Sequence, residues 1–402
     1  MRAVSEYLSE DLGINRKKVP LITKLLIGFY FILCFFEPYL NGAIGSVSKY
    51  FIFALMGIVM LTAKFFKLQY YHATMLIWFT YKVISVVWAD NTAIFELHIV
   101  SQIGMTALFI CLTMIKVDRE LLDIIIKAIW SGSAAIGVLS LFLSKPYHGA
   151  AENRLVLNLF GTEADPNNQA ALVVLGLAVS FYYIFWCRKY RLFAAAVALI
   201  NFYSIMLTGS RGGLVTVIML VAIVFFSNIR RIFTKRGLLL MLTLGILTVG
   251  GAFVVTRWLP SDIYTRLFVF ETYGGGSERS AIWANTWELI TQKANFIFGA
   301  GWGSYFGYNG FTDSVHNTFL SMLCDVGIIF TALFLFPVFE KTFYCWRKKE
   351  IIPVLLVIAG FVPSFFLEAI NKRFFWNAIF FVFMFANYLR DGGRFTPPVH
   401  KK

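Results

Sequence analysis

Residues 167–187, NNQAALVVLGLAVSFYYIFWC, contain no charged side chain. A helix needs about 20 predominantly apolar residues to cross the hydrocarbon core of a bilayer. From Ala170 onward the apolar residues of this stretch are nearly continuous, whereas a helix on the surface of a soluble domain keeps them to one face. The stretch therefore predicts a transmembrane helix.

The whole chain has the composition of a protein built from many such helices. Of its 402 residues, 58% are hydrophobic, 18% aromatic and 14% charged, whereas a soluble domain carries about 25% charged residues. This shortage of charge excludes a soluble enzyme, and the abundance of apolar residues excludes a disordered protein. We therefore expect an all-α polytopic membrane protein with a single transmembrane helical domain over residues 1–402.

Similar apolar stretches on both sides of residues 167–187 predict about 12 transmembrane helices. The candidate spans are residues 21–38, 50–63, 71–89, 97–115, 121–144, 167–187, 191–208, 212–228, 237–256, 315–339, 351–367 and 374–389. The first is expected to be retained as a span, because no cleavage site of small residues follows it. One large extramembranous loop, residues 257–314, separates the ninth and tenth spans, and a shorter one covers residues 145–166.

The distribution of lysine and arginine predicts the orientation. Most of the 36 basic residues fall in alternate connecting segments, beginning with the N-terminal one. Cytoplasmic loops are enriched in such residues, so both termini are expected in the cytoplasm and the two long loops outside it. Topology thus accounts for the net charge of +14, and no nucleic-acid partner is expected. The five cysteines show no CxxC pair, and we expect neither a metal nor a cofactor.

The long loop 257–314 has internal organisation. After the glycine run 274–276, an amphipathic helix is expected at about residues 278–294, with Trp283, Trp287, Ile290 and Ala294 on one face. Such a helix suits the headgroup layer of the membrane. The following sequence FGAGWGSYFG, residues 298–307, predicts tight backbone turns. It is not a dinucleotide-binding motif, because no strand precedes it.

Cations stand before three spans whose N-termini face outward. A helix N-terminus carries a partial positive charge, so a cation there is favourable when the site binds an anion such as phosphate. These cations are Arg211, His316 and the pair Lys372–Arg373. Around Arg211, the sequence TGSRGGLV predicts Ser210 as the helix N-cap and open backbone N–H groups at Gly212–Gly213. Anchoring to lipid headgroups is the alternative for each arginine and for Lys372.

Other polar residues have competing interpretations. His316 is suited to deprotonate a hydroxyl group near neutral pH, to bind phosphate in its charged form, or only to cap a helix. Asp165, which precedes Pro166, predicts a helix N-cap, and this leaves Glu163 as the freer carboxylate. Lys82 and Asp325 both fall within spans, where we expect them to form an ion pair without a chemical role.

Four motifs follow one another in a recognisable order. They are DPNNQAA (165–171), TGSRGGLV (208–215), ERSAIWANTWELI with FGAGWGSY (278–305), and VHNTFLSMLCDVGII (315–329). Together they resemble the O-antigen ligase and O-antigen polymerase superfamily of bacterial envelope glycosyltransferases over residues 160–330. The spacing of His316, Asn317 and Gly327 is similar to that of the ligase branch. Phe330 and the absence of histidine from DPNNQ depart from the ligase pattern and favour a polymerase.

The resemblance implies a metal-independent glycosyltransferase without a cofactor, in the bacterial inner membrane. Its donor would be a glycan linked to polyprenyl diphosphate, and its acceptor a sugar hydroxyl on a glycan or a lipid core. Membrane lipids would surround it, and a chain-length regulator is a further expected partner. The active site would lie on the extracytoplasmic face.

The resemblance also implies roles for single residues. Arg211 and Arg279 would stabilise the departing diphosphate, supported by Arg266, Arg373 and Lys372. His316 would orient or deprotonate the acceptor, with Glu163 as the substitute, and Asn317 would contact substrate. Trp302, like Tyr305 and Tyr308, would stack on sugars or else anchor in the headgroups.

Three classes of function compete. The favoured one is a repeat-unit polysaccharide polymerase, and the alternative within the family is an O-antigen ligase that transfers finished polymer to a lipid core. A flippase for lipid-linked oligosaccharides is the alternative from another class, but it would need polar residues spread through many spans. A structural scaffold would tolerate the loss of both Arg211 and His316.

Overall fold

The structure is a computed structural model that describes residues 19–44, 47–63, 67–148, 154–187, 190–228, 237, 242, 245–246, 257–268, 278–293, 295–310 and 314–395. The expected ninth span lies almost wholly outside these residues, as do the glycine run 274–276 and Ala294.

Each of the other expected spans contains a helix. These helices are α2 (Leu21–Ile44), α3 (Val47–Thr62), α4 (Tyr70–Ile84), α5 (Ala93–Met114), α6 (Arg119–Leu143), α7 (Pro166–Tyr182), α8 (Arg191–Leu207), α9 (Arg211–Asn228), α13 (Thr318–Arg347), α14 (Ile351–Phe361) and α15 (Arg373–Arg390). Within the described residues, six helices are long and apolar enough to cross a membrane. A mainly helical membrane protein is therefore supported, while the count of twelve and the sidedness of the loops stay predictions.

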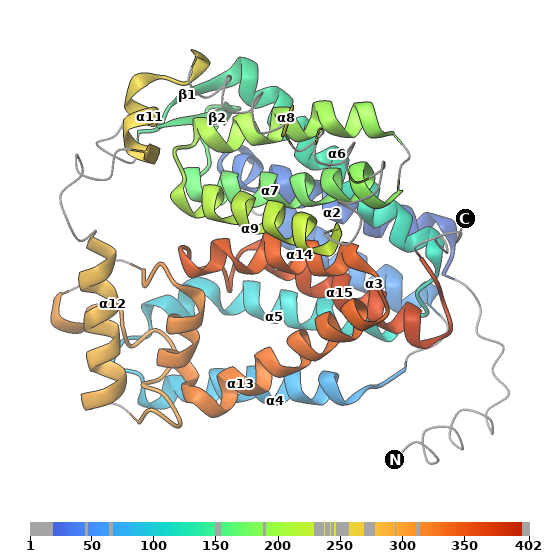
Figure 1. Cartoon of the computed structure of the whole chain (residues 1–402). Coiled ribbons are helices and arrows are strands. Elements are labelled where there is room, and N and C mark those ends of the chain that lie inside the picture. The colour runs from blue at the N-terminus through green and yellow to red at the C-terminus, as the bar shows by residue number, and fades with distance from the viewer. Residues whose placement is uncertain are drawn as a thin grey trace, which may run out of the picture.

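The helices pack side by side, and the non-spanning elements collect at one end of the bundle (Figure 1). These elements are α11 (Ser261–Phe268), α12 (Glu278–Glu288) and the strands β1 (Ser144–Pro146), β2 (Leu155–Leu159) and β3 (Thr162–Glu163). We call this the sheet end. The predicted orientation places it outside the cytoplasm.

The three strands correct the expectation of exclusively helical structure. They form an antiparallel sheet in the order β1-β2-β3, with Ser144 opposite Leu157 and Asn158 opposite Glu163. Phe160 and Gly161 connect β2 to β3 with φ values of 56° and 77°, as a two-residue hairpin turn requires. The strands are too short to give a clear alternating pattern, so the sequence alone did not predict them.

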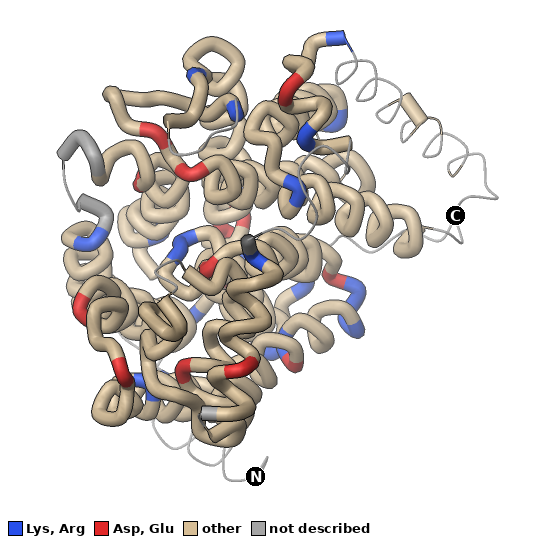
Figure 2. Tube along the Cα trace, turned by 90° about the vertical axis from the view of Figure 1, so that its left-hand side faces the viewer, with Lys and Arg blue, Asp and Glu red and all other residues tan. Residues whose placement is uncertain are grey.

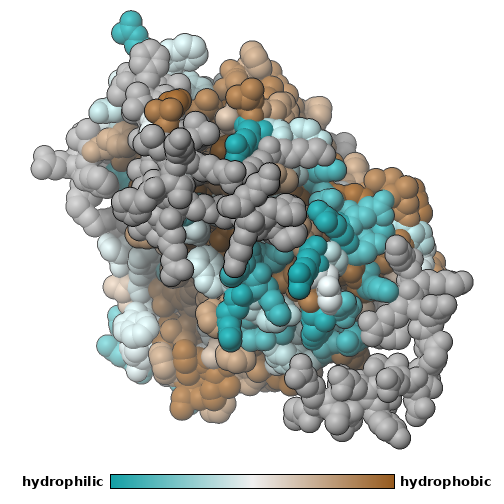
Figure 3. All heavy atoms as spheres, turned by 45° about the vertical axis from the view of Figure 1, so that its right-hand side comes forward, coloured by the Kyte–Doolittle hydropathy of each residue, from teal (hydrophilic) through white to brown (hydrophobic). Residues whose placement is uncertain are grey.

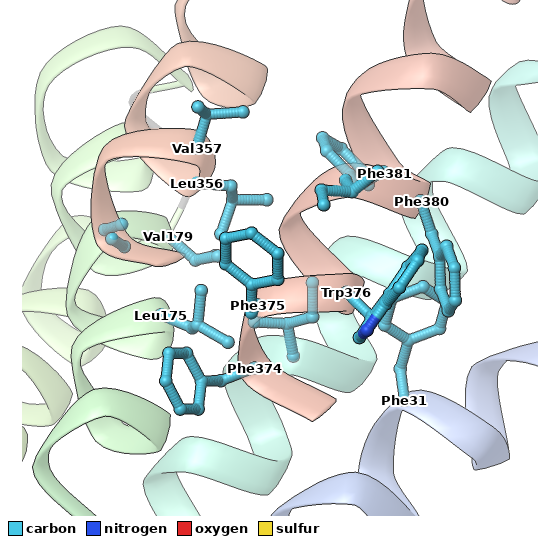
Figure 4. Packing of buried hydrophobic residues seen from close by; sticks show 14 of the residues in the cluster. Phe31, Leu175, Val179, Leu356, Val357, Phe374, Phe375, Trp376, Phe380 and Phe381 are labelled. Carbon is cyan, nitrogen blue, oxygen red and sulfur yellow. The ribbon is translucent and has the colours of Figure 1, made fainter. Parts of the chain in front are cut away.

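The core is centred on α15, which is mostly apolar and whose residues from Arg373 to Asn387 are all buried. Phe374, Phe375 and Trp376 lie between Leu175 of α7 and the neighbouring helices (Figure 4), and all three aromatic side chains are at most 1% exposed. A helix that is hydrophobic all round belongs in the interior of a bundle. α15 therefore lies in the interior of the bundle, where it contacts α2, α7, α13 and α14.

The predicted pair of Lys82 and Asp325 is confirmed. Lys82 Nζ lies 3.3 Å from Asp325 Oδ2, and the two side chains are 1% and 2% exposed. The ring of Trp302 lies against Lys82, with Nζ 4.5 Å from its centroid. Trp302 is itself only 1% exposed, so the prediction that it stacks on a sugar is wrong.

The glycine-rich loop makes tight turns, as predicted. Glycines 299, 301, 303 and 307 all have positive φ. At Gly301 a Cβ atom would lie 2.6 Å from the carbonyl oxygen of Ser85, so only glycine allows this approach. Gly327 interrupts α13 with a φ of 70°, and a Cβ there would lie 2.2 Å from the oxygen of Ile297. The loop thus packs backbone to backbone against α4 and α13.

Helix α12 packs against protein along part of its predicted apolar face. Trp283 Nε1 donates a hydrogen bond to the carbonyl of Val315 at 2.8 Å, and Ile290 is fully buried, whereas Trp287 is half exposed. Ile290 and Val315 share a small core with Tyr305. Trp283 of the expected apolar face thus contacts the protein, and the placement of the helix in the headgroup layer stays a prediction.

The opposite end of the bundle carries another polar region. In Figure 3, hydrophilic residues gather in one zone with hydrophobic surface beside it. A shallow pocket in the described structure joins the ends of α5 and α15 to the start of α4, and its lining includes Lys67, Gln69, Lys116, Asn387 and Arg390. Buried Lys24 also pairs there with the start of α6, through Asp118 at 2.5 Å. The predicted orientation places this end in the cytoplasm.

Candidate functional site

The turn between α8 and α9, residues 208–211, is held rigidly by its own side chains. Thr208 Oγ1 accepts a hydrogen bond from the N–H of Ser210, and Gly209 has a φ of 60°. Ser210 Oγ accepts from the N–H of Gly213 at 3.2 Å, so the predicted N-cap is confirmed. Arg211 is the first residue of α9 and is therefore placed at the N-terminus of this helix.

The two glycines that follow Arg211 serve packing. A Cβ on Gly212 would lie 3.0 Å from the ring of Phe366, and one on Gly213 would lie 3.0 Å from Ala170 and Ile205. The N–H of Gly213 is already occupied by Ser210. The prediction that both glycines leave open N–H groups for a ligand is thus wrong for Gly213.

Three arginines from separate segments meet at this turn. Arg154, just before β2, donates from Nε to the carbonyl of Thr208 at 2.7 Å and from Nη2 to Asn167 Oδ1 at 3.0 Å. Arg266, in the last turn of α11, donates to the carbonyl of Gly209 at 3.1 Å. Arg211 in turn donates through Nε and Nη2 to the carbonyl of Arg266, at 3.1 and 3.0 Å.

Arg279, at the start of α12, belongs to the same group through its charge. Burial lowers the pKa of Arg154 to about 10; Asp165 raises this pKa, and the positive charge of Arg279 lowers it. Burial also lowers the pKa of Arg279, and the charge of Asp165 opposes this shift. We call Arg154, Arg211, Arg266 and Arg279 the arginine cluster. Figure 2 views the sheet end and shows basic positions among acidic ones around the helix ends.

Asp165 is the carboxylate whose charge reaches both Arg154 and Arg279. It caps α7, as predicted, and its Oδ1 accepts from the N–H groups of Asn167 and Asn168 at 2.9 and 3.0 Å. Guanidinium groups gathered at one turn repel one another, and a bound anion relieves this repulsion. The arrangement is therefore suited to a multiply charged anion such as a diphosphate.

His316 is linked to the arginine cluster through α12. It follows Val315, whose carbonyl oxygen accepts a hydrogen bond from Nε1 of Trp283. Trp283 in turn lies one helical turn after Arg279 in α12. The backbone of His316 is left-handed, with a φ of 51°, and its Nδ1 lies 3.3 Å from Ser314 Oγ. Asn317 caps α13 and accepts from the N–H groups of Phe319 and Leu320 at 3.1 Å. Its side-chain oxygen is thus engaged in capping.

The other predicted site residues have different surroundings. Arg373 is 5% exposed and donates from Nε to both carboxylate oxygens of Glu37, at 3.0 and 2.8 Å. Lys372 is exposed. Glu163, predicted to be the freer carboxylate, accepts from the backbone N–H and Nδ1 of His148, at 3.0 and 3.1 Å.

A comparison with known families found a match. Residues 196–335 match the family O-antigen ligase. The chain carries an O-antigen ligase domain. The domain contains Arg211, Arg266, Arg279 and His316, while Arg154 precedes it. The match supports the O-antigen ligase and polymerase superfamily, and polysaccharide biosynthesis follows from the family. No curated protein matches the chain significantly.

Sequence reasoning missed Arg154. Its signal was present, because it is a basic residue in a segment predicted to be external and directly precedes the short apolar stretch LVLNL. Only the sheet brings it to the turn at residues 208–211, since β2 places residue 154 beside α7 and α8.

Proposed function

We propose that this protein is an integral-membrane glycosyltransferase of the bacterial inner membrane. It transfers a glycan from a polyprenyl-diphosphate carrier to a sugar hydroxyl on the extracytoplasmic face, with both termini in the cytoplasm. The observation that carries the proposal is the arginine cluster. Arg154, Arg211 and Arg266 meet at the start of α9, and the charge of Arg279 reaches Arg154. Three of these four residues lie in the O-antigen ligase domain.

The chemistry explains why arginine is needed. When the anomeric C–O bond breaks, its electron pair leaves on the diphosphate, and the growing negative charge must be stabilised. Fixed cations in a water-poor site lower the barrier, and removal of one such group costs about 10²–10³ in rate in well-studied enzymes. Arg211 and Arg279 hold the diphosphate, while Arg154 and Arg266 fix the turn that carries Arg211. His316, just before α13, orients the acceptor sugar.

Within this reaction class we favour a repeat-unit polymerase. The support is the DPNNQ sequence without histidine and the bulky Phe330, whose ring stacks on that of Tyr81 with centroids 3.4 Å apart. The second candidate is a ligase that transfers finished polymer to a lipid core, and the description of the matching family as O-antigen ligase favours it.

A glycan gel from a deletion strain tests both candidates. A polymerase defect leaves surface lipid bearing one repeat unit, whereas a ligase defect leaves bare lipid core beside intact carrier-linked polymer. Complementation with Arg211→Ala should fail, and complementation with the matched control Arg257→Ala, an exposed arginine just before α11, should succeed. Accumulation of carrier-linked units inside the cell would instead indicate a flippase and overturn the proposal.

A further inference from the structure

A short segment connects the arginine cluster to the start of the helix that follows His316. The segment is residues 366–369, between α14 and α15. Its Phe366 ring packs on Gly212, directly after Arg211. The carbonyl of Leu367 accepts from both the N–H and Oγ1 of Thr318, at 3.1 and 2.7 Å. The backbone of Glu368 is therefore fixed between the first turns of α9 and α13.

The carboxylate of Glu368 has a built environment. Its Oε1 accepts from the hydroxyl groups of Tyr305 and Ser321, at 2.8 and 3.2 Å, and its Oε2 lies 3.0 Å from the Tyr305 oxygen. Tyr305 is 4% exposed and Ser321 fully buried, but Glu368 itself keeps part of its surface exposed. Since an ionised carboxylate offers about four acceptor positions, Oε2 retains capacity for another donor.

Burial and a neighbouring negative charge make Glu368 a stronger base than an ordinary carboxylate. Burial raises the pKa of its carboxyl group, and the charge of Asp325 raises it further; the hydrogen bonds from Tyr305 and Ser321 and the charge of Lys82 act in the opposite direction. Cys324, which neighbours Asp325 on α13, interacts electrostatically with Glu368. Burial raises the pKa of the Tyr305 hydroxyl group well above its usual value. Tyr305 thus stays a neutral donor that holds Glu368 in place.

We propose that Glu368 binds the acceptor sugar's hydroxyl group and takes its proton during transfer. This inference rests on the proposed function and assigns the acceptor side of the same site. The hydroxyl oxygen forms the new bond to the anomeric carbon, and the anomeric C–O bond to phosphate breaks. The electron pair leaves on the diphosphate, held by the arginine cluster. The proton passes to Glu368 and then to solvent.

The test compares Glu368→Gln with the wild type. Glutamine retains an acceptor oxygen for Tyr305 and Ser321, so the protein should fold, but it cannot take the proton. Full-length variants in nanodiscs receive carrier-linked glycan and acceptor extracted from the deletion strain. We expect the product rate to fall by about 10²–10⁴-fold, the usual contribution of a general base. Glu368→Asp should restore part of it.

The pH profile separates chemistry from structure. The wild-type rate should rise with pH as Glu368 loses its proton, and the residual rate of Glu368→Gln should lack this rise. Glu340→Gln is the matched control, because Glu340 on α13 also pairs with a tyrosine, Tyr70, away from the site. It should keep the wild-type rate and profile.

The experiment distinguishes a wrong role for Glu368 from a wrong proposed function. If Glu368→Gln matches the wild type in rate and pH profile while Arg211→Ala is inactive, the role of Glu368 is refuted and the proposed function stands. If the wild type itself forms no product from carrier-linked glycan, or Arg211→Ala forms as much, the proposed function fails first. Tyr305→Phe should shift the profile without abolishing transfer; an unchanged profile would also contradict the assignment.

Discussion

Neutralising one member of the Lys82–Asp325 pair should strongly destabilise the protein, and neutralising both should not. The two side chains are at most 2% exposed, so Lys82→Met leaves Asp325 as an uncompensated buried charge, which costs about 3–5 kcal/mol. Asp325→Asn leaves Lys82 as the uncompensated buried charge, between the rings of Trp302 and Trp78 at 4.5 and 5.7 Å, and should cost a similar amount.

The double variant Lys82→Met/Asp325→Asn buries no charge. Its asparagine oxygen still accepts from the N–H of Gly303, which lies 3.0 Å from Asp325 Oδ1 in the wild type. We therefore predict a coupling energy of about 2–4 kcal/mol between the two substitutions, measured by reversible unfolding of the purified variants in detergent. Additive losses, or single variants within about 1 kcal/mol of the wild type, would refute a structural ion pair.

Three further substitutions test the site and its scaffold. Arg154→Met removes hydrogen bonds to Thr208 and Asn167, so it should lower the free energy of unfolding by about 2–4 kcal/mol. It should also slow polymer formation, measured on glycan gels, at least tenfold. An unchanged rate would show that Arg154 does not contribute to the site. Gly327→Ala places a Cβ 2.2 Å from a backbone oxygen at positive φ, so folded protein in size-exclusion profiles should be lost, and normal yield would contradict the kink. Glu163→Gln breaks a pair with His148, which is 81% exposed, so it should change stability by less than about 1 kcal/mol and leave glycan ladders intact; their disappearance would restore Glu163 as a candidate base.

The helices over the expected spans were predictable because long apolar helices are recognised by a local property. A run such as residues 167–187 needs only length and continuous apolarity, and neither depends on the rest of the chain. The pair of Lys82 and Asp325 was also predictable, since an ion buried in a helical bundle requires a partner. The cap at Asp165 follows from a local sequence pattern, Asp before Pro.

What the sequence did not predict depends on contacts between distant segments. Trp302 resembles an exposed aromatic residue of an external loop until the loop folds over Lys82. Arg154 joins the arginine cluster only through the sheet. Glu368 looks like an ordinary carboxylate between two spans, but burial in the folded protein and the charge of Asp325, which lies far from it in sequence, raise the pKa of its carboxyl group. Such properties appear only when tertiary packing is known.

The most direct test of the central claim, that the arginine cluster holds the departing diphosphate, is the affinity of the purified chain in nanodiscs for polyprenyl diphosphate without a glycan. We predict that Arg211→Ala and Arg279→Ala each weaken binding tenfold or more, since a hydrogen bond to a charged group contributes about 1.5–3 kcal/mol, and that Arg257→Ala binds like the wild type. Equal affinity of all four proteins would contradict it.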